Sequence, residues 1–396
     1  MDMKAIIKMA LFTPGVNGRW GLPLIFKAKP GSAKTATVQS SAKEWSLYME
    51  TMLGSLRDPT DFIGLPFPVA MKDGSTRSSM LAAPFAHRLV DAKRGVCFLD
   101  ELNLAPESVF AAMLRMVLEG VCGELQLPPE IRFLAAMNDA EDSAGGRPLP
   151  PPMANRFGHV EFEAPSAESW GDWALTGATS GDAVSAPQDP AAEERRVMEA
   201  WEVPYAKSRG LITAFVRKFP QLLNAMPPVS DPRSSGAFPT PRSWEMTMRS
   251  VAGCEVHALG AVESDMMVQA FVGEAAAKQF VVYKKMADLP DPIEVLDGKV
   301  KFVHNEQKLD RTIAVLSSCA ALVTSPNAAK RDDRADRLWT ILDGVCATAP
   351  DVAVPAVRAL AKAKVRLFTK FSEPVLTKLN PVLEAAGLIK KGNAKK

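Results

Sequence analysis

Several features that would narrow the protein's class are scarce or missing in the sequence. Its five cysteines are widely spaced, odd in number and without a C-x-x-C pair, which excludes a disulfide framework and a cysteine-rich zinc site. The formal net charge is only +2, and acids and bases are interspersed except in the tail KKGNAKK. This balance disfavours a nucleic-acid binder. The only apolar stretch at the start, in MDMKAIIKMALFTPG, is too short and too broken by Lys for a signal peptide or a membrane span. We therefore expect a cytoplasmic protein with a short amphipathic helix at its start.

The composition, 47% apolar and 23% charged, is typical of a globular protein, and the length allows two or three domains. Apolar runs without helical periodicity, at 22–28, 95–101 and 131–138, alternate with helical segments. This alternation predicts an α/β fold with a mostly parallel sheet sandwiched by helices. After the Gly, Ser, Ala and Pro stretch TGATSGDAVSAPQDPAAE, helical spacing predominates. The expected divisions are an α/β domain at 1–177, a linker at 178–193, a helical lid at 194–290 and a C-terminal helical extension at 291–396.

Residues 28–35, AKPGSAKT, nearly match the phosphate loop G-x-x-x-x-G-K-[ST], with alanines in place of both glycines. Lys34 could reach the outer phosphates and Thr35 could ligate Mg²⁺, while the backbone N–H groups at the following helix start would cradle the anion. Gly31 remains, and Ala is the smallest replacement for Gly. The loop alone leaves two interpretations open, a nucleotide site or a strand-to-helix turn without a special role. The expected binding segment comprises Pro30, Gly31, Ser32, Ala33, Lys34, Thr35 and Ala36.

Further polar residues follow the apolar strands downstream. The strand GVCFLDE ends in Asp100 and Glu101, and FLAAMND brings Asn138 to the same edge of a parallel sheet, where ligands bind. Asp100 could hold Mg²⁺, Glu101 could polarise an attacking water, and Asn138 could orient that water. Each also has an ordinary interpretation: two solvated acids and a capping amide. Arg156, in PPPMANRFGHVEF, ends a short predicted helix, where an arginine is usually a surface residue.

These motifs, in this order, resemble those of an AAA+ ATPase, and specifically the MoxR branch of the helix-2-insert clade in its actinobacterial form. PGSAKT is similar to the P-G-x-A-K-T that MoxR proteins commonly carry, so Ala33 matches the family's own variant. FLDELNLAPESVFAAMLRMVLEG resembles the Walker B strand and its helix, AAMN resembles sensor 1, PPPMANRF the arginine-finger segment, and PTPRSW sensor 2 of the lid. The resemblance covers about residues 15–290 well and the remainder weakly. Ala28, in place of the first loop glycine, departs from the pattern.

The resemblance implies ATP and Mg²⁺ as cofactors and a role for each motif residue. Lys34 and Thr35 would contact phosphate and Mg²⁺, with Asp100 on the metal. Glu101 would be the catalytic base, and Asn138 would sense the water. Arg242 would contact the γ-phosphate of its own subunit, whereas Arg156 would reach a neighbour's site as an arginine finger. Arg147, in AGGRPLP, is the alternative finger. The stretch 61–77 and the hairpin EGVCGELQLPPEIRF resemble segments that line the ring pore in relatives.

The expected function is that of an ATP-hydrolysing machine, a homo-oligomer that forms a ring of six and remodels or activates a client protein. MoxR relatives act as chaperones and often work with von Willebrand factor A domain proteins, which the resemblance implies as partners. The alternative is a nucleotide-gated scaffold that hydrolyses ATP slowly, indicated by Ala28. A nucleic-acid motor is disfavoured by the balanced charge, and a kinase or GTPase by the helical second half. The last hundred residues are either an added docking domain or an extended lid.

Overall fold

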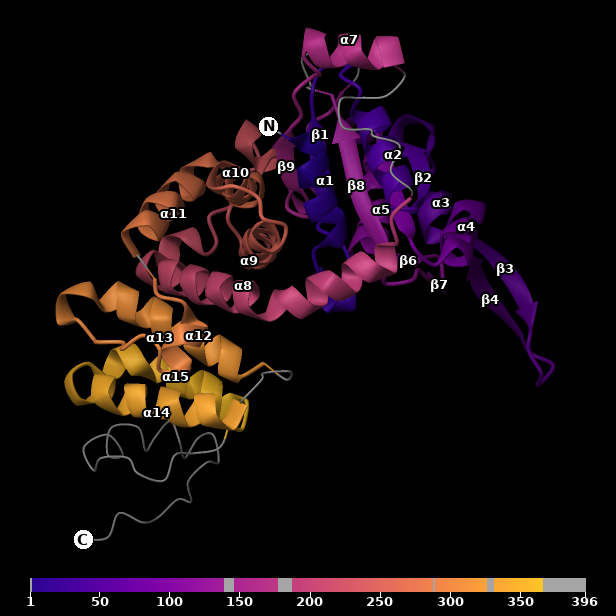
Figure 1. Cartoon of the computed structure of the whole chain (residues 1–396). Coiled ribbons are helices and arrows are strands. Elements are labelled where there is room, and N and C mark those ends of the chain that lie inside the picture. The colour runs from indigo at the N-terminus through magenta and orange to yellow at the C-terminus, as the bar shows by residue number, and fades with distance from the viewer. Residues whose placement is uncertain (1, 139–145, 177–186, 288, 326–330, 366–396) are drawn as a thin grey trace. The chain divides into compact units, whose positions relative to one another are not determined.

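The computed structural model describes residues 2–138, 146–176, 187–287, 289–325 and 331–365 (Figure 1). These residues form two compact units. The first comprises Met1–Met198 and Ala225–Ala276, and the second comprises Glu199–Asn224 and Ala277–Lys396. The helix α8 (Pro190–Lys218) contributes residues to both units, so the units are discontinuous in sequence. Their limits therefore differ from the expected linear division, and most of the expected linker, residues 178–186, lies outside the described residues.

The predicted parallel sheet is present in the first unit. Its five strands are ordered β2 (Tyr48–Leu53), β5 (Gly95–Asp100), β8 (Ile131–Met137), β1 (Leu24–Lys27) and β9 (Gly158–Glu161). Every neighbouring pair is parallel. Because β8 lies between β1 and β5, the loops that follow these three strands emerge side by side. The α/β prediction is confirmed.

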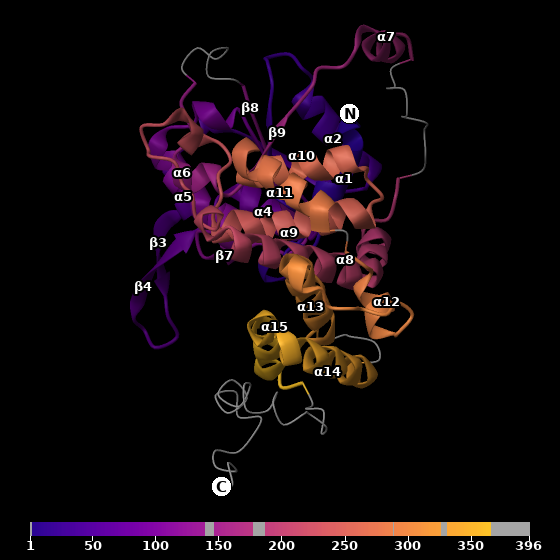
Figure 2. The ribbon, with the colours of Figure 1, turned by 90° about the vertical axis from the view of Figure 1, so that its left-hand side faces the viewer.

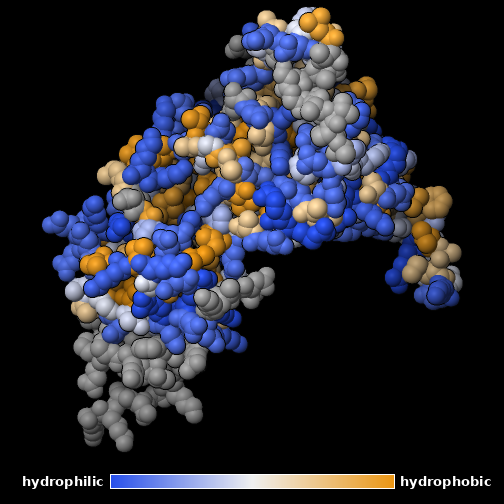
Figure 3. All heavy atoms as spheres, viewed as in Figure 1, coloured by the Kyte–Doolittle hydropathy of each residue, from blue (hydrophilic) through white to orange (hydrophobic). Residues whose placement is uncertain are grey.

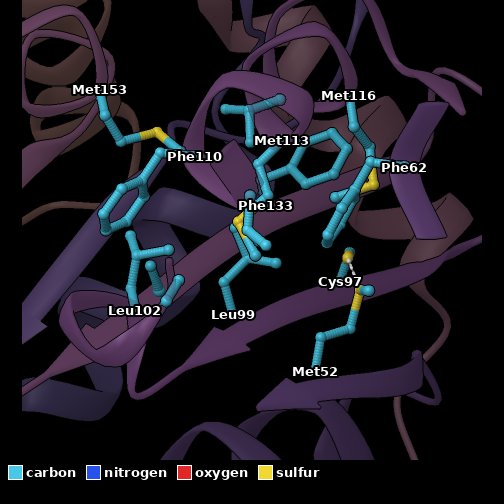
Figure 4. Close-up of a cluster of buried hydrophobic side chains, with 14 of the residues drawn as sticks. Met52, Phe62, Cys97, Leu99, Leu102, Phe110, Met113, Met116, Phe133 and Met153 are labelled. Atoms are coloured by element: carbon cyan, nitrogen blue, oxygen red, sulfur yellow. Dashed lines mark hydrogen bonds between the residues drawn. The ribbon is translucent and has the colours of Figure 1, made fainter. Parts of the chain in front are cut away.

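Helices cover the sheet on both faces because its central strands are largely apolar, with Arg132 of β8 as a buried exception. On one face, Leu99 of β5 and Phe133 of β8 pack in a cluster with Phe62 of α3 (Pro59–Ile63) and Met113 of α5 (Glu107–Glu119) (Figure 4). The helix α4 (Pro84–Ala92) adds Phe85 and Leu89 to the same cluster. The helices α1 (Met3–Phe12) and α2 (Lys34–Glu44) contact one another. The centroid of the Phe12 ring lies 4.7 Å from that of Trp45, which follows α2. The predicted first helix is confirmed.

A hairpin of β3 (Leu65–Ala70) and β4 (Thr76–Leu81) projects from the first unit (Figures 1 and 2). The turn between the two strands contains Gly74, with φ 80°. Met71 donates its N–H to the Ser75 carbonyl, which continues the cross-strand bonds at odd positions of β3. Pro66 and Pro68 take the even positions, so the outer edge of β3 has no N–H donor at either of them.

One face of this hairpin is apolar and exposed (Figure 3). Leu65, Phe67 and Val69 alternate with the prolines, as the period of a strand requires, and keep 59%, 54% and 39% of their surface exposed. A second, shorter hairpin, β6 (Val121–Cys122) and β7 (Leu125–Gln126), precedes β8 as predicted. The Ser79 hydroxyl donates to the Glu124 carboxylate at 2.6 Å, which joins the two hairpins. The projecting hairpin therefore has a fixed base and an apolar, exposed face.

The rest of the described chain is helical. The apolar stretch 265–286 is divided at Gly273 into α10 (Ala261–Val272) and α11 (Glu274–Ala287). Gly273 has φ 77°, and a Cβ there would lie 2.5 Å from the Ala237 carbonyl oxygen, so only Gly fits at this break. The first unit also holds α6 (Pro151–Ala154), α7 (Ala167–Thr176) and α9 (Pro241–Val256). The second holds α12 (Pro292–Leu296), α13 (Leu309–Val323), α14 (Arg331–Thr348) and α15 (Pro350–Lys362).

The second unit has its own core, centred on the fully buried Trp339 of α14. It thus has the C-terminal helices that the sequence predicts, up to residue 365, and the remainder of the expected extension lies outside the described residues. Across the described ranges, no helix combines the length and the apolar character that crossing a bilayer requires.

Candidate functional site

The phosphate-loop segment connects β1 to α2, as a phosphate site requires. The loop follows Lys27, and α2 begins at Lys34. Gly31 has φ 77° and Ala33 has φ 63°, so both adopt the left-handed conformation. Ala33 thus keeps the backbone geometry for which Gly is normally used, and the first N–H groups of α2 remain available to an anion.

Lys34 is buried within this loop, 7% exposed, and it donates to oxygen atoms on every side. Its Nζ lies 2.9 Å from the Ala28 carbonyl, 3.1 Å from the Lys29 carbonyl and 3.3 Å from Ser32 Oγ. A fourth bond, of 2.9 Å, reaches Asn138 Oδ1 at the end of β8. The loop is therefore curled around the ammonium group, and Asn138 is held directly beside it. Ala28 takes part through its carbonyl, which does not depend on the missing glycine.

Thr35 and Asp100 form the next part of the site. The Thr35 hydroxyl donates to Asp100 Oδ2 at 2.6 Å, which joins the first turn of α2 to the carboxyl end of β5. A hydroxyl and a carboxylate at this separation suit Mg²⁺, which takes few protein ligands and completes its shell with phosphate oxygens and water. No group of three or more metal-ligating His, Cys, Asp or Glu residues occurs in the described ranges.

Glu101 follows β5 in a strained conformation. Its φ of 50° is left-handed, a conformation that costs a non-Gly residue free energy. The Asp100 carboxylate accepts its N–H at 2.9 Å, and the Ser55 hydroxyl donates to Glu101 Oε2 at 3.1 Å. Gly54 allows this approach, since a Cβ there would lie 2.8 Å from the Glu101 carbonyl oxygen. Sequence reasoning missed Ser55 and Gly54, because a single Gly-Ser pair after a strand carries no distinctive pattern.

Asn103 is a second residue that the sequence did not single out. It is fully buried, and its side-chain amide donates to the backbone carbonyl of Asn138 at 3.0 Å. The backbone carbonyl of Asn103 accepts the Arg147 N–H at 3.0 Å. It therefore ties the segment after β5 to the end of β8, and it fixes the backbone at Arg147 on this side of the sheet. The Arg147 side chain is exposed.

Arg156 and Arg242 form a separate pair. Asn155 accepts a hydrogen bond of 2.8 Å from Thr240, the residue that caps α9, and donates to the Phe238 carbonyl at 3.3 Å. These bonds hold the start of α9 next to α6, so Arg242 follows the cap and Arg156 follows Asn155. Burial and the nearby Arg242 cation lower the pKa of Arg156 to about 10, which leaves it charged at neutral pH. Arg156 donates to the Pro152 carbonyl, but its buried Nε has no hydrogen-bond partner among the described residues.

Both arginines line a cavity of about 500 Å³ with Arg19, Glu119 and Glu245. The cavity also includes Pro23 and Phe133, which lie at the amino ends of β1 and β8. The phosphate loop follows the opposite, carboxyl end of β1. The two ends of this strand of four residues are roughly 13 Å apart. The structure thus brings together Lys34, Thr35, Asp100, Glu101 and Asn138, and it places Arg156 and Arg242 elsewhere. Arg242 lines the same cavity as Arg156, and its contact with the γ-phosphate of its own subunit stays a prediction.

The conformation of Ala33 leads to a prediction about stability. Replacing Ala33 with Gly should raise the free energy of unfolding by up to about 1 kcal/mol, because a left-handed conformation costs an L-residue roughly 1–2 kcal/mol and Gly nothing comparable. Urea denaturation would measure the change. Ala36 lies inside α2 with helical backbone, so Ala36→Gly should lower the free energy of unfolding by roughly 0.5–1 kcal/mol. Equal losses in both variants would show that Ala33 carries no strain.

Comparisons with known proteins add little to this geometry. No family model matches the chain. Among solved structures, the chain is similar to a proposed ATPase from Cytophaga hutchinsonii, with 15% sequence identity and a TM-score of 0.45. The match covers 72% of this chain and 88% of that one. That likeness assigns neither a family nor an activity to this chain.

Proposed function

We propose that this protein binds and hydrolyses ATP as a MoxR-type AAA+ ATPase. The observation that carries the proposal is the convergence of three loops. The Lys34–Asn138 and Thr35–Asp100 hydrogen bonds join these four residues at the carboxyl edge of one parallel sheet, and Glu101 follows Asp100 directly there. Each of these side chains has the chemistry that phosphoryl transfer to water requires.

In this proposal, each residue has one task. The N–H groups at the start of α2 and the Lys34 ammonium bind the outer phosphates, and Lys34 exchanges its present oxygen partners for phosphate oxygens. Thr35 and Asp100 hold Mg²⁺, which when bound neutralises charge on the phosphates. Glu101, oriented by Ser55, accepts a proton from the attacking water, and Asn138 orients that water.

The arginine pair supports a shared site. Both arginines line one cavity beside the amino ends of β1 and β8, whereas the phosphate loop follows the carboxyl end of β1. We propose that both arginines face the nucleotide of a neighbouring subunit, in a homo-oligomeric ring of six. The cavity that they line, with its unpartnered Arg156 Nε, would then receive the neighbour's phosphates.

The projecting hairpin supports a remodelling role. A hydrophobic face of Leu65, Phe67 and Val69 on an exposed two-stranded ribbon suits contact with apolar segments of a client protein. The client would be remodelled or activated by the ring, and a von Willebrand factor A domain protein is the partner class that the MoxR resemblance implies.

Steady-state ATPase activity, measured over a range of protein concentrations, tests the proposal. If each site needs an arginine from a neighbour, activity per subunit should rise with concentration until the ring is fully assembled, and Lys34→Ala should be inactive throughout. Activity per subunit that is independent of concentration in a monomeric protein would contradict the shared site. ATP-dependent assembly with hydrolysis that stays slow at every concentration, even with a partner present, would instead favour the nucleotide-gated scaffold.

A further inference from the structure

The second unit contains a groove that the ATPase proposal does not use. It has a volume of about 1140 Å³, at the upper end of what small-molecule sites need, and all its lining residues lie between Val295 and Thr348. One wall is a face of α14, where Arg337, Thr340, Ile341, Gly344, Val345 and Thr348 recur at helical spacing. The opposite wall is the segment 300–306, which precedes α13.

The charge of this groove is predominantly positive. Lys301, Arg311 and Arg337 line it, against the single acid Glu306. Within the described ranges, neither Lys301 nor Arg337 has an ion pair or a hydrogen bond. Arg337 is held in place by packing: its Nη2 would lie 2.0 Å from a Cβ at Gly298, so its guanidinium group occupies the space that the glycine leaves. The groove thus presents cations without partners, from both of its walls.

The second wall also presents main-chain groups without partners. Lys301, Phe302 and Val303 belong to no helix or strand, and no described residue makes a hydrogen bond with their backbone. The next residue, His304, anchors the segment through a bond of 2.9 Å between its Nδ1 and Thr312 Oγ1. Lys301 and Val303 are exposed, so these N–H and C=O groups can exchange water for the main chain of an extended peptide.

The floor is apolar and open at one point. Val295 and Val345 are buried there, and Phe302 and Ile341 are half-buried. Gly344 lies within α14, where another residue would stabilise the helix better. A Cβ there would have room, because no atom apart from the helix's own backbone lies within 4 Å of it. A glycine inside a helix costs roughly 0.5–1 kcal/mol relative to Ala, and here it widens the groove.

We propose that this groove binds an extended, acidic segment of a partner protein. Its backbone would pair with residues 301–303, its apolar side chains would contact the floor, and its carboxylates would meet Lys301 and Arg337. The proposal goes beyond ATP hydrolysis, since every residue it uses belongs to the second unit.

Binding of a short fluorescein-labelled peptide of alternating glutamate and leucine, measured by anisotropy without nucleotide, tests the proposal. The full-length protein should bind it saturably and more weakly as salt increases, whereas the peptide with lysine for glutamate should not bind. Lys301→Glu and Arg337→Glu should each weaken binding by about tenfold or more. Lys299→Glu, at an exposed position outside the groove, should leave binding unchanged.

The decisive variant is Gly344→Leu, which should abolish peptide binding by filling the groove. Its new side chain has room, and Leu favours helix more than Gly does, so the variant should fold and keep its ATPase activity. Equal binding of both peptides, an effect of Lys299→Glu as large as that of Arg337→Glu, or full binding by Gly344→Leu would each overturn the proposal. Preference for a single-stranded oligonucleotide over the acidic peptide would also overturn it.

Discussion

Replacing Arg156 with Ala should slow ATP hydrolysis by about 10³-fold or more and change ATP binding little. Arginine fingers in other nucleotide hydrolases contribute about 10³–10⁵ in rate, because they meet charge that develops on the γ-phosphate during transfer. Single-turnover hydrolysis and equilibrium nucleotide binding would separate the two effects. Arg195→Ala, which removes an exposed arginine whose carboxylate neighbour lies 3.8 Å away, is the matched control and should hydrolyse ATP normally.

Mixing two inactive variants tests whether the arginine acts across subunits. In a ring that contains both Arg156→Ala and Glu101→Gln, some interfaces place an intact Glu101 opposite an intact Arg156, so part of the activity should return. Arg242→Ala should behave like Arg156→Ala in the same mixture, because the two arginines share one cavity. If mixing restores nothing and Arg147→Ala shows the predicted loss, Arg147 is the finger. If none of these arginines affects turnover, the shared site is wrong.

Replacing Glu101 with Gln should stop hydrolysis, with a loss of about 10²–10⁴-fold, while ATP still binds. The amide keeps the shape of the side chain but cannot accept the proton of the attacking water. Lys34→Ala should instead lose ATP binding itself, because it removes the cation that contacts the phosphates. Fluorescent-nucleotide binding combined with phosphate release would distinguish the two variants. Glu107→Gln and Lys43→Ala, at exposed positions, are the matched controls. Wild-type affinity in Lys34→Ala would place the nucleotide elsewhere.

Much of the first unit could be predicted because its determinants are local. The buried strands are continuous apolar runs, and polar residues directly after them must gather where parallel strands end. For that reason, the contact between Lys34 and Asn138 follows from the motifs and the strand order. Ala33 could also be interpreted as a glycine substitute, and its φ of 63° agrees with that interpretation.

The remainder depends on contacts between segments that lie far apart in the sequence. The pairing of Arg156 with Arg242 depends on a hydrogen bond between Asn155 and the cap of α9, which no local pattern indicates. The discontinuous units result from the long helix α8, which begins at Pro190, near the end of the expected linker, and contributes residues to both units. The groove of the second unit depends on how the segment 300–306 lies beside α14, and neither segment alone has a distinctive sequence.

The prolines of the projecting hairpin have a consequence for assembly. A ring would bring several copies of this hairpin close together, each with an exposed apolar face, and such ribbons readily join edge to edge into a continuous sheet. Pro66 and Pro68 remove two donors from the free edge of β3, which disfavours a ladder of hydrogen bonds there between copies. Glu124, bonded to Ser79, adds a charge near the base of β4. In a ring, pairing between copies through the β3 edge would therefore be disfavoured, while the apolar face stays open to other chains.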